Sequence, residues 1–282
     1  MEASKDKIRV GDIVYVDLSK NINYCSPNEW EASLGKPIGV VAIPRDFLPD
    51  SPEMRIISLF EVGYCKKKEA KIHNGDCWCL ESNPNEISSL SYYHFISNEL
   101  DVEKNAIVKK RGVFLCSDKF ASRPNPYDTG YGWYIIGTSN APSPYKEDGS
   151  FNEQIIDKRY FPIKRQLNPL TDFNGKGNTD ILCDLKFYPA ANACKEYKAY
   201  KGDKLKWYLP SIGELAVYFH DFNKINASIE KVGGLPISQV QVYWSSTQNS
   251  SRNALSLHPD IGIMFPARKQ FINLVRPFTQ IN

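Results

Sequence analysis

Trp207-Tyr-Leu-Pro-Ser-Ile-Gly-Glu-Leu215 contains the clearest helix start in the chain. Ser211 and Glu214 have the spacing of a capping box, in which each side chain accepts a hydrogen bond from a backbone N–H that the first turn leaves unpaired. Apolar residues then recur at helical spacing, and Gly233-Gly234 supplies a stop. The pattern predicts an amphipathic helix, or two short helices broken near Asp221. Its apolar stripe is expected to face the core and consists of Leu215, Tyr218, Phe219, Phe222, Ile225 and Ile229.

Strands are predicted at both ends of the chain, on either side of two helical regions. The second helix is expected at 189–199, where Pro189 stands in the first turn and its missing N–H costs nothing. We expect an α+β fold in which strands from the two ends of the chain lie side by side in one sheet. Runs of β-branched and aromatic residues predict strands near 8–17, 37–44, 55–62, 108–120, 132–138, 240–247, 253–257 and 271–278.

Charge and hydropathy argue against two classes of protein. Lys and Arg total 35 against 32 Asp and Glu, a formal net charge of +3, whereas a dedicated nucleic-acid binder usually carries a strongly basic stripe. The longest apolar runs, such as 38–43 and 216–219, are far shorter than the ~20 residues that a membrane helix needs. We therefore expect no nucleic-acid partner and no membrane insertion.

The N-terminus and the cysteines bear on where the protein is made. Residues 1–12 contain no apolar stretch behind their charges, so no secretory signal is visible. Either a signal has been removed, or the protein stays in a cytoplasm until assembly or lysis. The 7 cysteines are widely spread and odd in number, which favours free thiols over a disulfide framework. Both features are typical of cytoplasmic synthesis.

Signatures of catalysis are missing from the sequence, and one group of residues resembles a metal site. We find no nucleophile elbow, phosphate loop, zinc-protease motif or dinucleotide fingerprint. The metal-like group consists of Cys65, His73, Cys77 and Cys79. Its spacing differs from the usual zinc knuckle, and two core thiols that flank Trp78 explain the Cys-x-Cys pair equally well. We expect a non-enzymatic protein with no metal and no cofactor.

Several motifs in order resemble a known family. They are Phe187-Tyr-Pro-Ala-Ala-Asn-Ala-Cys194, the Trp207–Leu215 stretch, Tyr243-Trp-Ser-Ser-Thr247, Asn253-Ala254, Gly262, Lys269 and Val275-Arg-Pro277. Together they resemble a widespread family of C-type-lectin-fold domains of gut anaerobes and their phages, related to the variable proteins of diversity-generating retroelements. The resemblance covers about residues 183–278. The strands before residue 63 are also similar to the leading strands of that family, whereas 64–182 matches nothing we recognise.

The resemblance implies a fold and a domain organisation. The fold would be C-type-lectin-like, with a twisted antiparallel sheet, two helices and adjacent N- and C-terminal strands. Residues 8–63 would supply the N-terminal strands, 64–182 a β-rich insertion or subdomain, and 183–282 the C-terminal core with a ligand-display surface.

The resemblance also implies the positions of the ligand-binding residues. In retroelement-diversified relatives the variable positions are often Asn, and most of the aligned residues here are reachable from an Asn codon by changing adenines. Gln270 is not, and Ala267 and Asn273 occupy two further aligned positions. The implied ligand-binding residues are Arg252, His258, Asp260, Ile263, Phe265, Pro266, Arg268, Gln270 and Phe271.

The segment 263–267 supports a display surface on physical grounds. Ile263-Met-Phe-Pro-Ala267 is apolar and is followed by Arg268 and Lys269. If it is exposed, it forms an apolar patch with a basic rim, the composition of a binding hot spot. The alternative is a core strand in which Ile263 and Phe265 point inward. Arg276 is expected to be a structural ion-pair partner.

These inferences predict a ligand- or receptor-binding protein, adhesin-like and not an enzyme. The expected setting is a phage tail or fibre, made in the host cytoplasm and carried by the virion. The alternatives are a bacterial surface or fimbrial adhesin and a purely structural virion component. The expected partner is a host cell-surface glycan or protein, without calcium. Other virion or surface-structure proteins, and a second copy of the chain, are further candidate partners.

Overall fold

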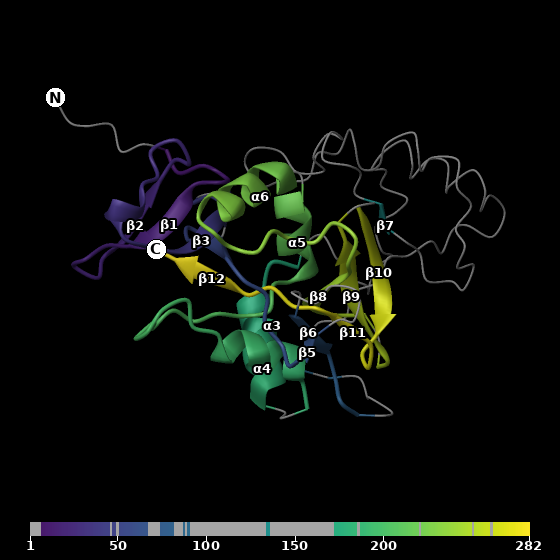
Figure 1. Ribbon diagram of the computed structural model, residues 1–282. Helices are drawn as coiled ribbons and strands as arrows, with labels where there is room; N and C mark the ends of the chain where they lie inside the picture. Colours follow the sequence, from purple (N-terminus) through teal and green to yellow (C-terminus); the bar gives the residue numbers. More distant parts are fainter. Residues whose placement is uncertain are drawn as a thin grey trace.

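The protein has an α+β fold with two sheets and four α-helices in the residues that the structure describes (Figure 1). The structure is a computed structural model. It describes residues 7–45, 47–48, 51–66, 74–81, 87, 89–90, 134–135, 172–184, 187–219, 221–249, 251–259 and 262–282.

A five-stranded antiparallel sheet has the order β12-β4-β3-β1-β2. The β-branched run in β3 is buried because both faces of this sheet are covered. The C-terminal strand β12 pairs with β4 of the N-terminal region, so strands from the two ends of the chain lie side by side in one sheet, as predicted. The first strand, β1, is separated from β12 by β4 and β3. The strands are β1 (Ile13–Val16), β2 (Ile22–Cys25), β3 (Lys36–Ile43), β4 (Met54–Ser58) and β12 (Phe278–Ile281).

A second sheet has seven strands in the order β5-β6-β11-β8-β9-β10-β7. The sequence predicted a single sheet, whereas the structure has two. The expected strand 271–278 is divided at Val275–Pro277, so that β11 belongs to one sheet and β12 to the other. The strands are β5 (Cys65–Lys66), β6 (Asn74–Cys77), β7 (Tyr134–Ile135), β8 (Tyr243–Gln248), β9 (Asn253–His258), β10 (Ile263–Arg268) and β11 (Ile272–Leu274). The expected strand 108–120 lies outside the described residues.

The helices are α3 (Gly175–Asp184), α4 (Pro189–Glu196), α5 (Ile212–Phe219) and α6 (Phe222–Lys231), with a short 3-10 turn, η1, at Ala32–Leu34. The prediction of two helical regions is confirmed. One is α4, with Pro189 in its first turn, and the other is the pair α5 and α6, with the break at Asp221. It missed α3, which lies in the segment expected to be β-rich. Gly175 and Gly177 in its first turn are poor helix formers, so the local sequence does not indicate a helix.

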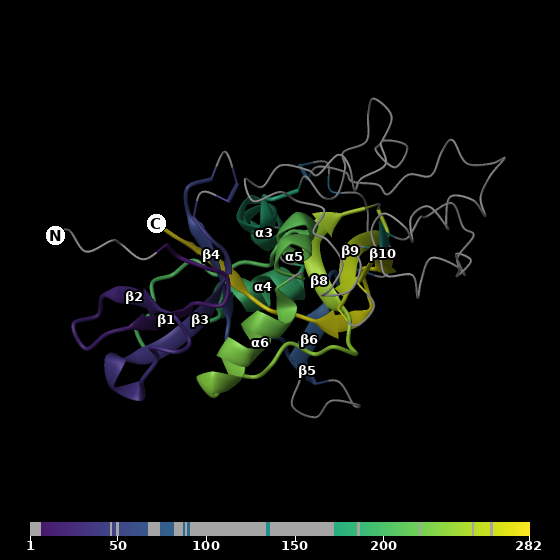
Figure 2. The ribbon, with the colours of Figure 1, turned by 90° about the horizontal axis from the view of Figure 1, so that it is seen from above.

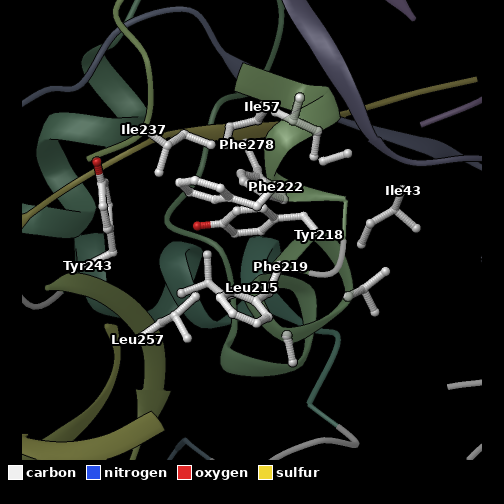
Figure 3. Close-up of a cluster of buried hydrophobic side chains, with 14 of the residues drawn as sticks. Ile43, Ile57, Leu215, Tyr218, Phe219, Phe222, Ile237, Tyr243, Leu257 and Phe278 are labelled. Carbon is white, nitrogen blue, oxygen red and sulfur yellow. The ribbon is translucent and has the colours of Figure 1, made fainter. Parts of the chain in front are cut away.

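The main core lies between the two sheets, where α5 and α6 pack against β3 on one side and α5 packs against β8 and β9 on the other (Figures 1 and 2). All six residues of the predicted apolar stripe are buried there. Figure 3 shows Leu215, Phe219 and Tyr218 of α5 between Leu257 of one sheet and Phe278 of the other. The stripe is therefore core, as predicted.

The capping box is confirmed and is buried. Ser211 N donates to Glu214 Oε2 at 2.8 Å, and Glu214 Oε1 accepts from Tyr208 Oη at 2.9 Å and from Arg55 Nε at 2.7 Å. One carboxylate therefore fixes the start of α5 and joins it to β4 of the five-stranded sheet.

Alkaline pH is expected to destabilise the fold. Burial raises the pKa of Tyr197 to about 12 from its ordinary 10.0, and burial likewise raises the pKa of Tyr208, Tyr218 and Tyr243. The unfolded chain releases these protons first, so the contribution of Tyr197 is complete below pH 10 and is lost as pH rises through 12. Urea denaturation at stepped pH should show a loss of about 2 kcal/mol or more over that range.

Tyr197→Phe is the matched variant for this effect. It removes one titrating phenol and should reduce the loss of stability between the two pH values. A free energy of unfolding that stays constant in wild type through this range would contradict the burial of these phenols.

Candidate binding surface at the end of the β9–β10 hairpin

The Trp-Ser-Ser-Thr motif is buried and structural. Ser245 Oγ donates to Leu255 O at 2.7 Å, and Thr247 Oγ1 accepts from the Ile212 N–H at 2.9 Å. The side chains of Ser245, Ser246 and Thr247 are wholly buried. The motif therefore binds β8 to β9 and to the first turn of α5, and it offers no atoms to a ligand.

Asp172 is buried beside this motif and accepts several hydrogen bonds. Its carboxylate accepts hydrogen bonds from the Thr247 hydroxyl at 2.5 Å, from Asn178 Nδ2 at 3.1 Å and from the Asn174 N–H at 3.1 Å. Burial raises the pKa of Asp172, and these three donors oppose that shift. Because its oxygens are used internally, Asp172 anchors α3 to β8.

Arg276 is an ion-pair partner, as predicted. Its Nη2 lies 3.2 Å from Glu61 Oε1, and both side chains are almost fully buried. The same guanidinium donates to Ser58 O at 3.1 Å and to Leu235 O at 2.8 Å. The Tyr243 hydroxyl donates to the same carboxylate. Arg276 therefore joins the crossover between β11 and β12 to the core.

The expected exposed apolar run is a strand of the core. In β10, Met264 is wholly buried in the main core and Ala267 is buried in the cluster around Trp78. Phe265 packs against that second cluster and is half-buried. The run is therefore not exposed as a whole, which corrects the patch interpretation. The alternative interpretation, a core strand, agrees better with the structure. It predicted that Ile263 and Phe265 point inward, whereas Met264 is the residue of β10 that is buried in the main core.

The structure separates the predicted ligand-binding residues into groups. His258 and Ile263 pair at the turn end of the β9–β10 hairpin. Asp260 lies outside the described residues, and Phe265 and Pro266 lie between the two ends of β10. At the open end, Asn253 pairs with Arg268, and the Lys269 N–H donates to Arg252 O. The residues gathered at this open end are Arg252, Arg268, Gln270 and Phe271.

Backbone hydrogen bonds bring three segments that carry exposed apolar residues together at this open end. The Leu80 N–H donates to Phe187 O, and the Cys79 N–H donates to Lys269 O. Leu80 is 63% exposed, Phe187 50%, Phe271 55% and Ile272 40%. Arg252 and Arg268 are also exposed. We call this surface the hairpin-end patch: Leu80, Phe187, Arg252, Arg268, Phe271 and Ile272. Figure 1 shows β11 beside β6, and β10 farther along the same sheet.

The hairpin-end patch stands on a rigid base. Lys269 is wholly buried, with Nζ 4.6 Å from the Trp78 ring centroid and 2.9 Å from Gln248 Oε1. Gln270 Nε2 donates to Glu81 O at 2.9 Å, and Gln270 O accepts from Cys77 Sγ at 3.2 Å. These contacts fix the turn between β10 and β11, so the exposed side chains of Arg268 and Phe271 extend from an ordered backbone.

The sequence prediction missed Leu80, Phe187 and Ile272. An isolated apolar residue in a loop carries no signal of its own, since single exposed apolar residues are common. Only the backbone hydrogen bonds between three distant segments bring these residues near one another.

The Cys-x-Cys segment agrees with the core interpretation for Trp78 and Cys79, which are both buried. Cys77 is half-buried, and burial raises the pKa of both thiols. Among the residues that the structure describes, no three His, Cys, Asp or Glu side chains gather as metal ligands. His73 lies outside them. The cysteines in the described ranges, which exclude Cys116, are free thiols.

No helix within the described part of the chain is long and apolar enough to cross a membrane.

Comparison with known proteins gives one structural likeness. No family model and no curated protein matches the chain. The structure is similar to the crystal structure of a fimbrial protein from Bacteroides ovatus ATCC 8483, with a TM-score of 0.52 and 15% sequence identity. The match covers 97% of this chain and 49% of that protein, so the chain spans about half its length. At this identity the likeness concerns the fold.

Proposed function

We propose that this protein is a non-enzymatic recognition protein of adhesin type, with a C-type-lectin-like domain that binds its ligand through the hairpin-end patch. The observation that supports the proposal is the patch itself. Four large apolar side chains are between 40% and 63% exposed on an ordered base. Clustered exposed apolar groups beside arginines are the composition of a binding hot spot.

The buried motifs supply the scaffold in this proposal. The capping box, the Trp-Ser-Ser-Thr strand and Arg276 all bond inside the core, so substitutions at the hairpin-end patch leave them intact. A fold that keeps its specificity residues at a strand end and its motifs in the interior suits a display role, which is what the family resemblance implies.

For the setting, we propose a bacterial surface structure. The fold likeness to a fimbrial protein supports this alternative of the sequence analysis. The virion setting rests on the sequence resemblance and on the free thiols. Immunogold labelling of the producing cells and of any phage they release separates the two settings. Label on virions alone would overturn the surface setting and leave the recognition proposal standing.

Substitution of the hairpin-end patch is expected to weaken attachment strongly. Phe271→Ser combined with Arg268→Glu should reduce binding of the labelled protein to target cells at least about tenfold, because both an apolar anchor and a charge are lost. Flow cytometry against a panel of bacterial and epithelial cells measures the loss.

The matched control changes the same residue classes far from the patch. Leu18→Ser combined with Lys36→Glu lies at the five-stranded sheet, where Leu18 is 94% exposed. It should attach like wild type, and circular dichroism should show that both variants are folded. Equal attachment by the patch variant and wild type would overturn the proposed site and favour a structural role.

A further inference from the structure

We infer that the ligand of the hairpin-end patch is a protein segment that combines apolar side chains with an acidic residue, rather than a glycan. This inference rests on the proposed function and specifies its partner class. It follows from which groups at the patch are already used, from the shapes of the exposed side chains and from their charge.

The polar groups beneath the patch are bonded to the protein itself. The side-chain amide of Gln270 donates to Glu81 O, and its backbone carbonyl accepts from Cys77. The Lys269 ammonium is wholly buried over Trp78. A sugar presents hydroxyl groups on every side, and each hydroxyl that is desolvated without a partner costs free energy. The Gln270 amide and the Lys269 ammonium are therefore already engaged, which leaves fewer directional groups for the hydroxyl groups of a sugar.

The exposed apolar side chains have the shapes of a protein interface. Leu80 and Ile272 are aliphatic and branched, so they lack the flat ring on which a sugar face stacks. They pack well against apolar side chains, and the exposed side chains of Phe187 and Phe271 add aromatic rings to the same patch. This combination is typical of the buried centre of a protein–protein interface.

Charge at the patch favours an acidic group on the partner. The Arg268 side chain is exposed, and its guanidinium has no hydrogen-bond or ion-pair partner within the described residues. The Arg252 backbone lies beside it, because its carbonyl accepts from the Lys269 N–H. A carboxylate on the partner would form a charge-assisted, bidentate pair with the Arg268 guanidinium, and the pairing would fix the orientation of the apolar contacts.

Strand addition at the patch is not the binding mode. β11 already lies between β6 and β8, so both of its edges are paired. Pro266 lacks an N–H and interrupts the outer edge of β10 beyond the two residues that pair with β7. The partner therefore makes contact through side chains.

Selection from a random peptide library displayed on yeast tests the inference. The full-length protein is the bait, and the Phe271→Ser/Arg268→Glu variant is the counter-selection bait. We expect enriched peptides that carry apolar residues together with Asp or Glu. In fluorescence polarisation the synthetic peptide should bind wild type and lose about tenfold or more in affinity with either single substitution.

A charge swap makes the test specific. Arg268→Glu should recover binding of the peptide whose acidic residue is replaced by Lys, while Leu18→Ser should bind the original peptide like wild type. A glycan array with the same proteins forms the second arm. Glycan binding that depends on Phe271, with no enriched peptide, would overturn the inference and leave the proposed function standing. If neither arm gives binding that depends on the patch, both are overturned.

Discussion

Replacing Glu214 by alanine is expected to lower the free energy of unfolding by about 3–5 kcal/mol, because it leaves the Arg55 charge buried without its partner. The two side chains are 0% and 3% exposed, and their Nε–Oε1 distance is 2.7 Å. The same carboxylate accepts from Tyr208 and from the Ser211 N–H. Alanine therefore removes the ion pair, the tyrosine contact and the cap of α5 together.

A double substitution distinguishes the lost charge pair from lost packing. Arg55→Met with Glu214→Leu removes both charges and should cost less than the sum of the single changes. Urea denaturation followed by circular dichroism gives all the values. A loss below about 1 kcal/mol for Glu214→Ala would show that the pair is not buried, since exposed pairs contribute about that much.

Replacing Trp78 by alanine is expected to cost about 3–5 kcal/mol, the range for removing a large aromatic side chain from a core. Its indole N–H donates to Ser245 O at 2.8 Å, and its ring packs edge-on against Tyr188 with centroids 5.3 Å apart. The ring also lies under the buried Lys269 ammonium. The alanine variant therefore has a cavity, an unpaired carbonyl and a cation without its aromatic neighbour.

Trp78→Phe is the control for this prediction. It keeps a ring beside Lys269 and Tyr188 but loses the N–H, so the expected loss lies between wild type and Trp78→Ala. Chemical denaturation of the three proteins gives the order. Equal stability of Trp78→Ala and Trp78→Phe would contradict a role for the ring itself. Because Lys269 lies between Arg268 and Gln270, Trp78→Ala should also weaken binding at the hairpin-end patch.

Local signals in the sequence were sufficient for much of the scaffold. The Ser211 and Glu214 spacing predicted the capping box, Asp221 marked the break between α5 and α6, and Pro189 marked the start of α4. Each depends on backbone chemistry within one or two helical turns. The strands β1, β3, β4, β8 and β9 were also predicted, because their β-branched and aromatic runs are short and bounded by turns.

The features that sequence reasoning missed depend on contacts between distant segments. Helix α3 begins at Gly175, and a Cβ there would lie 2.2 Å from Glu214 Oε2 and 2.7 Å from Ser211 N. Glycine is needed because the capping box of another helix approaches closely, which a local propensity cannot indicate. Likewise, the position of Met264 in the main core follows from the pairing of β10 with β9.

The crossover between the two sheets has a mechanical consequence. Phe271 directly precedes β11, and the chain then passes the buried Arg276–Glu61 pair before it enters β12. A force applied to a ligand held at Phe271 would therefore load β11 in shear against β6 and β8. The Arg276–Glu61 pair would then pass the force to the five-stranded sheet. Because β11 and β12 belong to different sheets, the last segment of the chain would transmit an applied force from one sheet to the other.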